Sequence, residues 1–257
     1  MTIIQRFVKS LYSPKDIAKY RFLGIGKTIL YVFLLMLLST IPSLYHLSKM
    51  SIQALNEGKQ IFMDELPPFI IENGELTSNE NKPIIIKKDG FDIIFDSTGK
   101  TTENDVRNHG NAIALLKDEF FVVNNQTGQN FSYSTFQDKK MENKDIDKFL
   151  TSIHGVLWIV IPIIFVFLYL FTAALGFIKV SIFAAIGVLI AQALNRKLQY
   201  RQSWRLAAHS ITLPTVFFFL MDAIKTVVPG GLFINWIVCF IMLYLSIREI
   251  PQPKIKA

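Results

Sequence analysis

Residues 154–194 read HGVLWIVIPIIFVFLYLFTAALGFIKVSIFAAIGVLIAQAL, an apolar run whose one formal charge is Lys179. An α-helix rises about 1.5 Å per residue, so about 20 apolar residues cross the hydrocarbon core of a bilayer. The run is about twice as long as one such span. It therefore predicts two membrane helices joined by a turn near Gly176 to Lys179, where a glycine and a charge come close together.

Three further apolar segments have the length of membrane spans. The first, TILYVFLLMLLSTIPSLYHL, covers Thr28–Leu47 without a charge. We interpret it as a retained anchor, because its apolar part starts late for a cleavable signal peptide and no small-residue cleavage site follows. The other two cover residues 206–228 and 232–247, on either side of a Pro-Gly-Gly turn.

The predicted fold class is an α-helical polytopic membrane bundle of about five transmembrane helices with an inserted small α+β domain. That domain is mainly antiparallel β and extracytoplasmic. The predicted organisation along the chain is a cytoplasmic basic amphipathic segment, a first membrane helix, the extracytoplasmic domain, a C-terminal membrane bundle and a tail, at residues 1–27, 28–47, 48–152, 153–249 and 250–257.

The charges are divided along the chain in a way that fits this organisation. Residues 1–48 carry a net charge of +5, residues 49–148 carry −5, and residues 149–257 carry +7. A nucleic-acid-binding protein gathers Lys and Arg on one soluble surface, whereas here they flank apolar segments, so we expect no nucleic-acid partner. The positive-inside rule places the N terminus in the cytoplasm. We expect the protein to be a multi-pass protein of the cell (plasma) membrane.

Five crossings conflict with the positive-inside rule in the C-terminal half. They would leave both the basic loop 195–205 (NRKLQYRQSWR) and the tail from residue 248 outside the cytoplasm. Four crossings, with one half of residues 154–194 re-entrant, would return both segments to the cytoplasm. Length favours five helices, whereas the positive-inside rule favours four crossings. Both topologies therefore remain open after residue 154.

Hairpin signals dominate the segment between the first two spans. Asn73-Gly74 and Asp89-Gly90 each separate two short apolar runs, and such pairs favour two-residue hairpins because both positions tolerate positive φ. A third hairpin is predicted between residues 120–123 and 130–136. These signals predict a small sheet that is mainly antiparallel.

Two helices and one turn complete the predicted domain. Residues 103–119 are compatible with one helix whose apolar side, including Leu115, faces the sheet. A second helix, capped by Asn143, is predicted to run into the membrane. Asp96-Ser97-Thr98-Gly99 predicts a turn that follows a strand.

Ionisable and polar residues inside the spans are the candidate functional residues, because their burial in lipid is costly. Asp222 and Lys225 are three residues apart and form a candidate intramembrane polar pair. His209, Ser210 and Arg205 are candidate polar residues of the bundle. Lys179 is interpreted as a snorkelling residue at a helix turn.

Neither catalytic residues nor a cofactor or metal site is predicted. The one cysteine, Cys239, lies in an apolar run, and the four histidines are too dispersed to form a ligand pair along a helix.

The chain resembles, over nearly its full length, a family of Gram-positive bacterial multi-pass membrane proteins of unknown function, some of them labelled maltodextrin utilisation proteins. The resemblance is carried by FVKSLYSPKDIAKYRFLGIGKTILYVFLL, LPPFIIENGEL, FDIIFDSTG and AQALNRKLQYRQSWRLAAHSITLPTV, at residues 7–35, 66–76, 91–99 and 191–216. The last segment also resembles, more weakly, the Yip1-like membrane proteins, which implies a five-helix bundle. No catalytic residues carry over from either family.

Two functions follow as expectations. The first is a non-enzymatic accessory or sensor protein whose extracytoplasmic domain binds a partner or an envelope ligand. The second is a small transporter or transport subunit, which the family labels would link to maltodextrin uptake. The expected partners are the lipid bilayer and another membrane or envelope protein.

Overall fold

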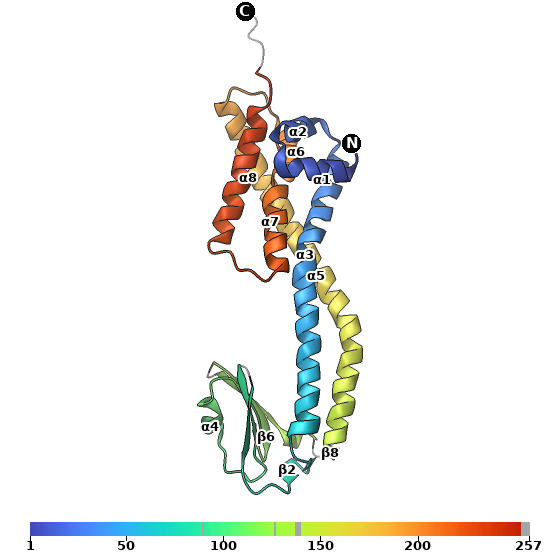
Figure 1. The fold of residues 1–257 in the computed structure, drawn as a ribbon, viewed down its shortest axis with the longest axis vertical. Helices are drawn as coiled ribbons and strands as arrows, with labels where there is room; N and C mark the ends of the chain where they lie inside the picture. Colours follow the sequence, from blue (N-terminus) through green and yellow to red (C-terminus); the bar gives the residue numbers. More distant parts are fainter. Residues whose placement is uncertain (89, 126, 137–139, 253–257) are drawn as a thin grey trace, which may run out of the picture. The chain divides into compact units, whose positions relative to one another are not determined.

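The computed structural model describes residues 1–88, 90–125, 127–136 and 140–252. The chain divides into two compact units, and the long helices α3 (Ile25–Gln60) and α5 (Asn143–Ala193) contribute to both. We call residues 1–49 and 160–257 the helical unit and residues 50–159 the sheet unit. Figure 1 shows both units along the coloured chain.

The helical unit opens with short helices that pack beside the main bundle: α1 (Ile3–Tyr12), α2 (Pro14–Lys19) and the 3₁₀ turn η1 (Tyr20–Phe22). Helix α1 directs Arg6 and Ser10 into the protein and leaves Ile4, Val8 and Tyr12 exposed. An apolar outer face beside apolar spans is typical of a helix that lies in a membrane interface.

Four helical segments in the described part of the chain are long and apolar enough to cross a membrane. Helix α3 continues as the π-helical turn η2 (Ile61–Glu65), and the third segment contains α6 (Tyr200–Ser210) and α7 (Thr212–Ala223) in succession. The remaining two are α5 and α8 (Gly231–Arg248). Pro214 lies in the first turn of α7, where a missing N–H leaves no helix bond unmade.

The predicted turn near Gly176 to Lys179 is absent, because α5 runs without interruption through both residues. This finding corrects the count of five helices. Gly176 serves helix packing instead of a turn, since a Cβ atom there would collide with the side chain of Met36 on α3. Lys179 contacts Asn235 of α8 and is therefore not at a helix tip.

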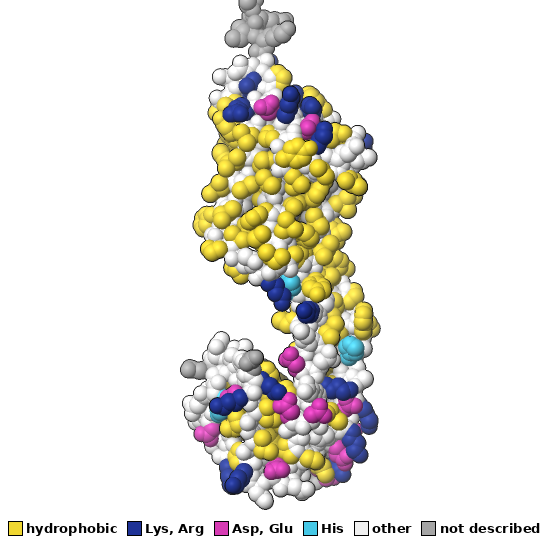
Figure 2. All heavy atoms as spheres, viewed as in Figure 1, with side chains coloured by type: hydrophobic (Ala, Val, Ile, Leu, Met, Phe, Trp, Pro, Cys, Tyr) yellow, Lys and Arg dark blue, Asp and Glu magenta, His cyan; other side chains and the backbone are white. Residues whose placement is uncertain are grey.

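Basic residues meet at one end of the helical unit. Arg205 donates a hydrogen bond to the carbonyl of Arg21 at 2.7 Å, and Arg196 donates to the carbonyl of Arg248 at 3.3 Å. The first contact joins α6 to η1, and the second joins the loop after α5 to the end of α8. Figure 2 shows Lys and Arg side chains gathered at this end, beyond a broad apolar surface over α7 and α8.

The described residues of the sheet unit form two sheets. The first has three antiparallel strands in the order β2-β1-β8, and the second has five strands in the order β3-β4-β5-β6-β7 with only β4 and β5 parallel. Their bounds are β1 (Phe69–Glu72), β2 (Glu75–Ser78), β3 (Ile84–Lys88), β4 (Phe91–Phe95), β5 (Ala112–Leu115), β6 (Glu119–Asn124), β7 (Thr127–Ser132) and β8 (Met141–Glu142). Helix α4 (Glu103–Arg107) lies in the crossover from β4 to β5, and the 3₁₀ turn η3 (Tyr133–Phe136) follows β7.

The three predicted hairpins are present. Asn73 and Gly74 form a two-residue turn with φ of 53° and 83°, and β3 pairs with β4 across the second predicted turn, whose Asp89 lies outside the described residues. Strands β6 and β7 form the third hairpin, with Asn125 at a φ of 46°.

The helix predicted over residues 103–119 is wrong beyond its first turns. Helix α4 ends at Arg107, and Gly110 has a φ of 79°, which a helix does not accommodate. Residues from Ala112 to Leu115 form the strand between β4 and β6. A strand that is buried on both faces has a continuous apolar sequence, which cannot be told from a buried helix by its periodicity. Asp96 forms the predicted turn by accepting hydrogen bonds from Thr98 and Thr101.

Candidate functional site

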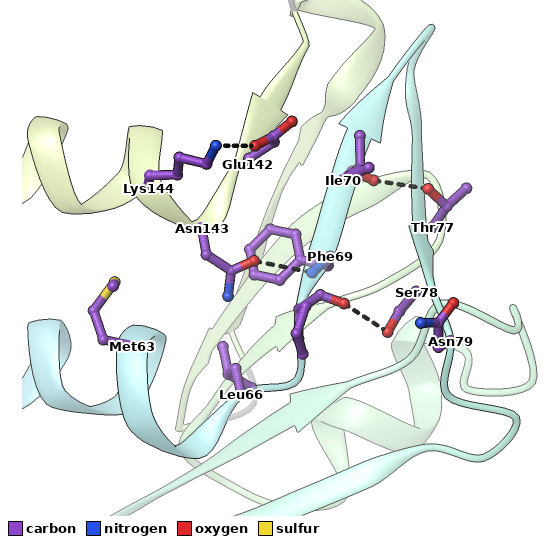
Figure 3. Close-up of a pocket in the computed structure, with 11 residues that line it drawn as sticks. Met63, Leu66, Phe69, Ile70, Thr77, Ser78, Asn79, Glu142, Asn143 and Lys144 are labelled. Carbon is purple, nitrogen blue, oxygen red and sulfur yellow. Dashed lines mark hydrogen bonds and ion pairs between the residues drawn. The ribbon is translucent and has the colours of Figure 1, made fainter.

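The sheet unit contains an open cleft of about 590 Å³ where helical and strand segments meet (Figure 3). Its apolar floor is formed by Met63, Leu66, Phe69 and Ile70. Polar residues at the end of β2, at the end of β8 and at the start of α5 form the rim: Thr77, Ser78, Asn79, Glu142, Asn143 and Lys144. The cleft therefore touches the end of the first long helix, the three-stranded sheet and the start of the second long helix.

Asn143 connects these three elements. Its Oδ1 atom accepts a hydrogen bond from the N–H of Phe69 at 2.9 Å, and its Nδ2 atom donates to the carbonyls of Phe62 at 3.3 Å and Pro67 at 3.4 Å. β8 pairs with only two residues of β1, so the Asn143 side chain takes the place of a strand at Phe69. Asn143 is thus not the predicted helix cap; Asp145 accepts from the N–H of Glu142 instead.

An ion pair holds the same region from the helical side. Lys59 near the end of α3 contacts Asp147 in α5 at 2.7 Å. Because both side chains are partly exposed, such a pair contributes about 0–1 kcal/mol. The geometry nonetheless ties α3 to α5 one turn beyond Asn143.

The cleft carries little net charge. Glu142 is paired with Lys140 at 3.0 Å and with Lys144 at 3.2 Å. Both lysines lower the pKa of Glu142 through hydrogen bonds, and Lys140 has the larger effect. Thr77 and Ser78 donate their hydroxyl hydrogens to the main-chain carbonyls of Ile70 and Pro68. Both hydroxyl hydrogens are therefore held by main-chain carbonyls of the same sheet unit.

A second open cavity, of about 570 Å³, lies between the helices of the helical unit. Helices α3, α5, α7 and α8 all contribute to its wall. Its polar side chains include Ser39, Ser43, Thr215, Lys179, Asp222 and Asn235, and its apolar side chains include Met36, Phe218 and Phe219. Polar groups from four apolar helices thus converge on one space.

Asp222 and Lys225 do not form the predicted pair. Helix α7 ends at Ala223, and Lys225 follows in a left-handed conformation with a φ of 55°, so the two side chains do not share a helix face. Asp222 instead accepts a hydrogen bond from the Ser43 hydroxyl at 3.0 Å, and its main-chain carbonyl accepts one from His46 at 2.7 Å.

His209, Ser210 and Arg205 lie on α6, separate from the contacts of Asp222. His209 is fully buried, stacks on Tyr31 with ring centroids 4.3 Å apart, and donates from Nδ1 to the carbonyl of Arg205 at 2.8 Å. Ser210 donates to the carbonyl of Leu206, one turn earlier. Two of these three side chains therefore act within their own helix, while Arg205 contacts the carbonyl of Arg21.

Several residues of these two sites carry no signal in the sequence. Ser43 and His46 lie on α3, about 180 residues from their partner Asp222, and Asn235 lies in the last span. Asn143 is visible in the sequence as a residue before a helix, but its three partners belong to a segment about 75 residues earlier. Such pairings follow only from the tertiary fold.

Comparison with known proteins gives one finding about the chain as a whole. A family model described as "Protein of unknown function (DUF1189)" matches residues 4–247. No curated protein and no solved structure matches the chain.

Proposed function

The chain belongs to the DUF1189 family of proteins of unknown function, and we propose from its architecture that it is a non-enzymatic membrane sensor or accessory protein. In this proposal the sheet unit lies outside the cytoplasm and binds a partner segment in the cleft around Asn143. The observation that carries it is the cleft itself, which is lined by the ends of two long helices as well as by the sheet.

The orientation is supported by the four apolar helices together with the charges. From a cytoplasmic N terminus, four crossings place residues 194–199 and the end of α8 on the cytoplasmic side, without a re-entrant segment. The contacts of Arg196 with Arg248 and of Arg205 with Arg21 bring these basic segments to one end of the helical unit. The sheet unit, which carries the acidic excess, then lies on the other side of the plasma membrane.

A sensing role is supported by the position of Asn143. An occupant of the cleft contacts β1, β2 and the first turn of α5 at once. Any displacement of Asn143 changes its hydrogen bonds to Phe69, Phe62 and Pro67 together. We infer that binding in the cleft is thereby coupled to the two helices that continue toward the membrane. A ligand shifts the equilibrium between two arrangements of Asn143 only if it binds them with different affinity.

The chemistry of the cleft favours a short extended peptide segment of an envelope protein. Its apolar floor accepts an apolar side chain, and its charged rim groups neutralise each other. β2 is the edge strand of this sheet. The N–H of Leu76 on its outer edge donates to the carbonyl of Lys117 at 2.7 Å, so an added strand is expected to pair beyond Leu76, along residues 77–79 that line the cleft.

Site-specific photo-crosslinking tests this proposal. A photoreactive phenylalanine analogue is placed at Asn79, an exposed residue of the cleft rim, in the full chain in its native membrane. The control position is Lys87, which is exposed on β3 and outside the cleft. A discrete adduct from Asn79 that is absent from Lys87 is expected. Absence of an adduct at Asn79, or the same adducts at both positions, would refute partner binding in the cleft.

Transport is the second candidate function, favoured by the cavity that four apolar helices line. A transport pathway requires that the cavity opens to each side of the membrane in turn. A cysteine in place of Thr215, in a Cys239→Ser background, should then react with water-soluble thiol reagents from either side. Reaction from one side only would exclude a pathway through this cavity.

A further inference from the structure

We propose that the cavity in the helical unit binds the anionic head of an amphiphile, with Lys179 as the residue that holds the negative charge. The proposal rests on the location of the second candidate function but requires no transport. It follows from three properties of the cavity: a cation without an anionic partner, an apolar wall beside it, and a separate anion at a distance.

Lys179 is the first property. Its ammonium group contacts the amide oxygen of Asn235, and no carboxylate of the described residues lies within 4 Å of it. Asn235 also accepts a weak hydrogen bond from the Cys239 thiol at 3.8 Å. An amide oxygen satisfies one donor of an ammonium group but does not neutralise its charge. A lysine placed among apolar helices without a carboxylate partner is a candidate binding site, because its burial in lipid is costly.

The wall beside Lys179 is the second property. Gly176, one turn earlier on α5, lies against Met36 of α3, and both line the cavity. Leu175, Phe218 and Phe219 add apolar surface to the same cavity. A hydrocarbon chain therefore has apolar contacts next to the cation, as amphiphile binding requires.

The position of Asp222 is the third property. Asp222 accepts a hydrogen bond from Ser43 of α3, whereas Gly176, one turn from Lys179, lies against Met36 of α3. Ser43 and Met36 are about 10 Å apart along that helix. The carboxylate therefore does not neutralise Lys179. It makes its own end of the cavity unfavourable for an anion, so the anionic head is directed to the Lys179 end.

Anionic amphiphiles reach the protein from two sources: an anionic phospholipid of the bilayer, or a free fatty acid. Both carry a negatively charged oxygen group on an apolar body. Exposed side chains of α5 and α8, among them Ile178 and Ile234, give the outer surface near the cavity the character of a lipid contact.

Native mass spectrometry of the full chain in detergent tests binding without transport. The probes are phosphatidylglycerol, myristate, and phosphatidylcholine as the lipid without net charge. Wild type is expected to bind at least one anionic probe in preference to phosphatidylcholine. Lys179→Gln is expected to weaken that binding about tenfold or more, since hydrogen bonds to charged groups are among the stronger ones.

Two matched variants make the test specific. Lys15→Gln removes the same charge from an exposed position of α2, and it should bind like wild type. Asp222→Asn removes the opposing charge from the same cavity, and it should bind as well as wild type or more tightly. Melting temperatures of all variants show whether each one is folded.

The outcomes are distinct. Preference for phosphatidylglycerol identifies the bilayer as the source, and preference for myristate identifies a free amphiphile; either supports the site. Wild-type affinity in a folded Lys179→Gln protein, or equal loss in Lys15→Gln, overturns it. Because the assay measures binding alone, a failure of the transport hypothesis leaves this result unaffected.

Discussion

Replacing Asn143 by alanine should loosen the junction between the first sheet and the long helices. The change removes one hydrogen bond to the N–H of Phe69 and two longer ones to the carbonyls of Phe62 and Pro67. Phe69 is 3% exposed, so its N–H is left with little access to water. Loss of the bond together with an unsatisfied donor costs about 2–3 kcal/mol.

Hydrogen–deuterium exchange of the full chain measures this cost locally. A factor of ten in an equilibrium corresponds to about 1.4 kcal/mol, so the amides of β1 should exchange about 30-fold to 140-fold faster. Asn143→Asp keeps an acceptor for Phe69 but loses the amide donor, and it should lie between the alanine variant and wild type. Asn79→Ala is the control, because Asn79 lines the same cleft and is exposed.

Unchanged exchange of β1 in Asn143→Ala would refute the reasoning. It would mean that the three hydrogen bonds do not hold the sheet to the helices. An equal increase in Asn79→Ala would also contradict it, since the effect would then belong to the cleft surface in general.

Two further predictions concern the stability of each unit. Gly187→Ala should lower the melting temperature, at a cost of about 1–3 kcal/mol, because its Cβ would collide with the hydroxyl of Ser203; Gly155→Ala, which has open space around its Cβ, should not. Burial opposes ionisation of Asp96, but hydrogen bonds from Thr98 and Thr101 outweigh it and lower its pKa below 3.8. Its contribution is therefore complete above pH about 4 and lost as the pH falls, so exchange protection of β4 should decline less on acidification in Asp96→Asn than in wild type.

Local signals in the sequence predict the hairpins but not every strand. Asn73 and Gly74 both adopt positive φ, which few residue pairs tolerate, so the turn is fixed by its own residues. The segment from Ala112 to Leu115 is different, because its strand conformation comes from pairing with β4 and β6. Its apolar composition suits a helix equally well, and tertiary pairing decides between the two.

The helix count shows the same limit in the membrane segments. Length alone divides residues 154–194 into two spans, yet one helix continues through Gly176 and Lys179. The reason lies in contacts with other helices: Gly176 accommodates Met36, and Lys179 meets Asn235. The sequence likewise identifies Asp222 and His209 as polar residues of the spans. Their partners Ser43, His46 and Tyr31 can be identified only from the packing of the helices.

The most direct test of the account is the side of the membrane on which the sheet unit lies. Single cysteines at Ser78 in β2, Lys197 after α5 and Val228 before α8, each in a Cys239→Ser background, are treated in intact cells with a membrane-impermeant maleimide. Four crossings from a cytoplasmic N terminus predict labelling at residues 78 and 228, and labelling at residue 197 only after lysis. Labelling of residue 197 in intact cells, or protection of residue 78, would contradict an extracytoplasmic sheet unit between two membrane helices.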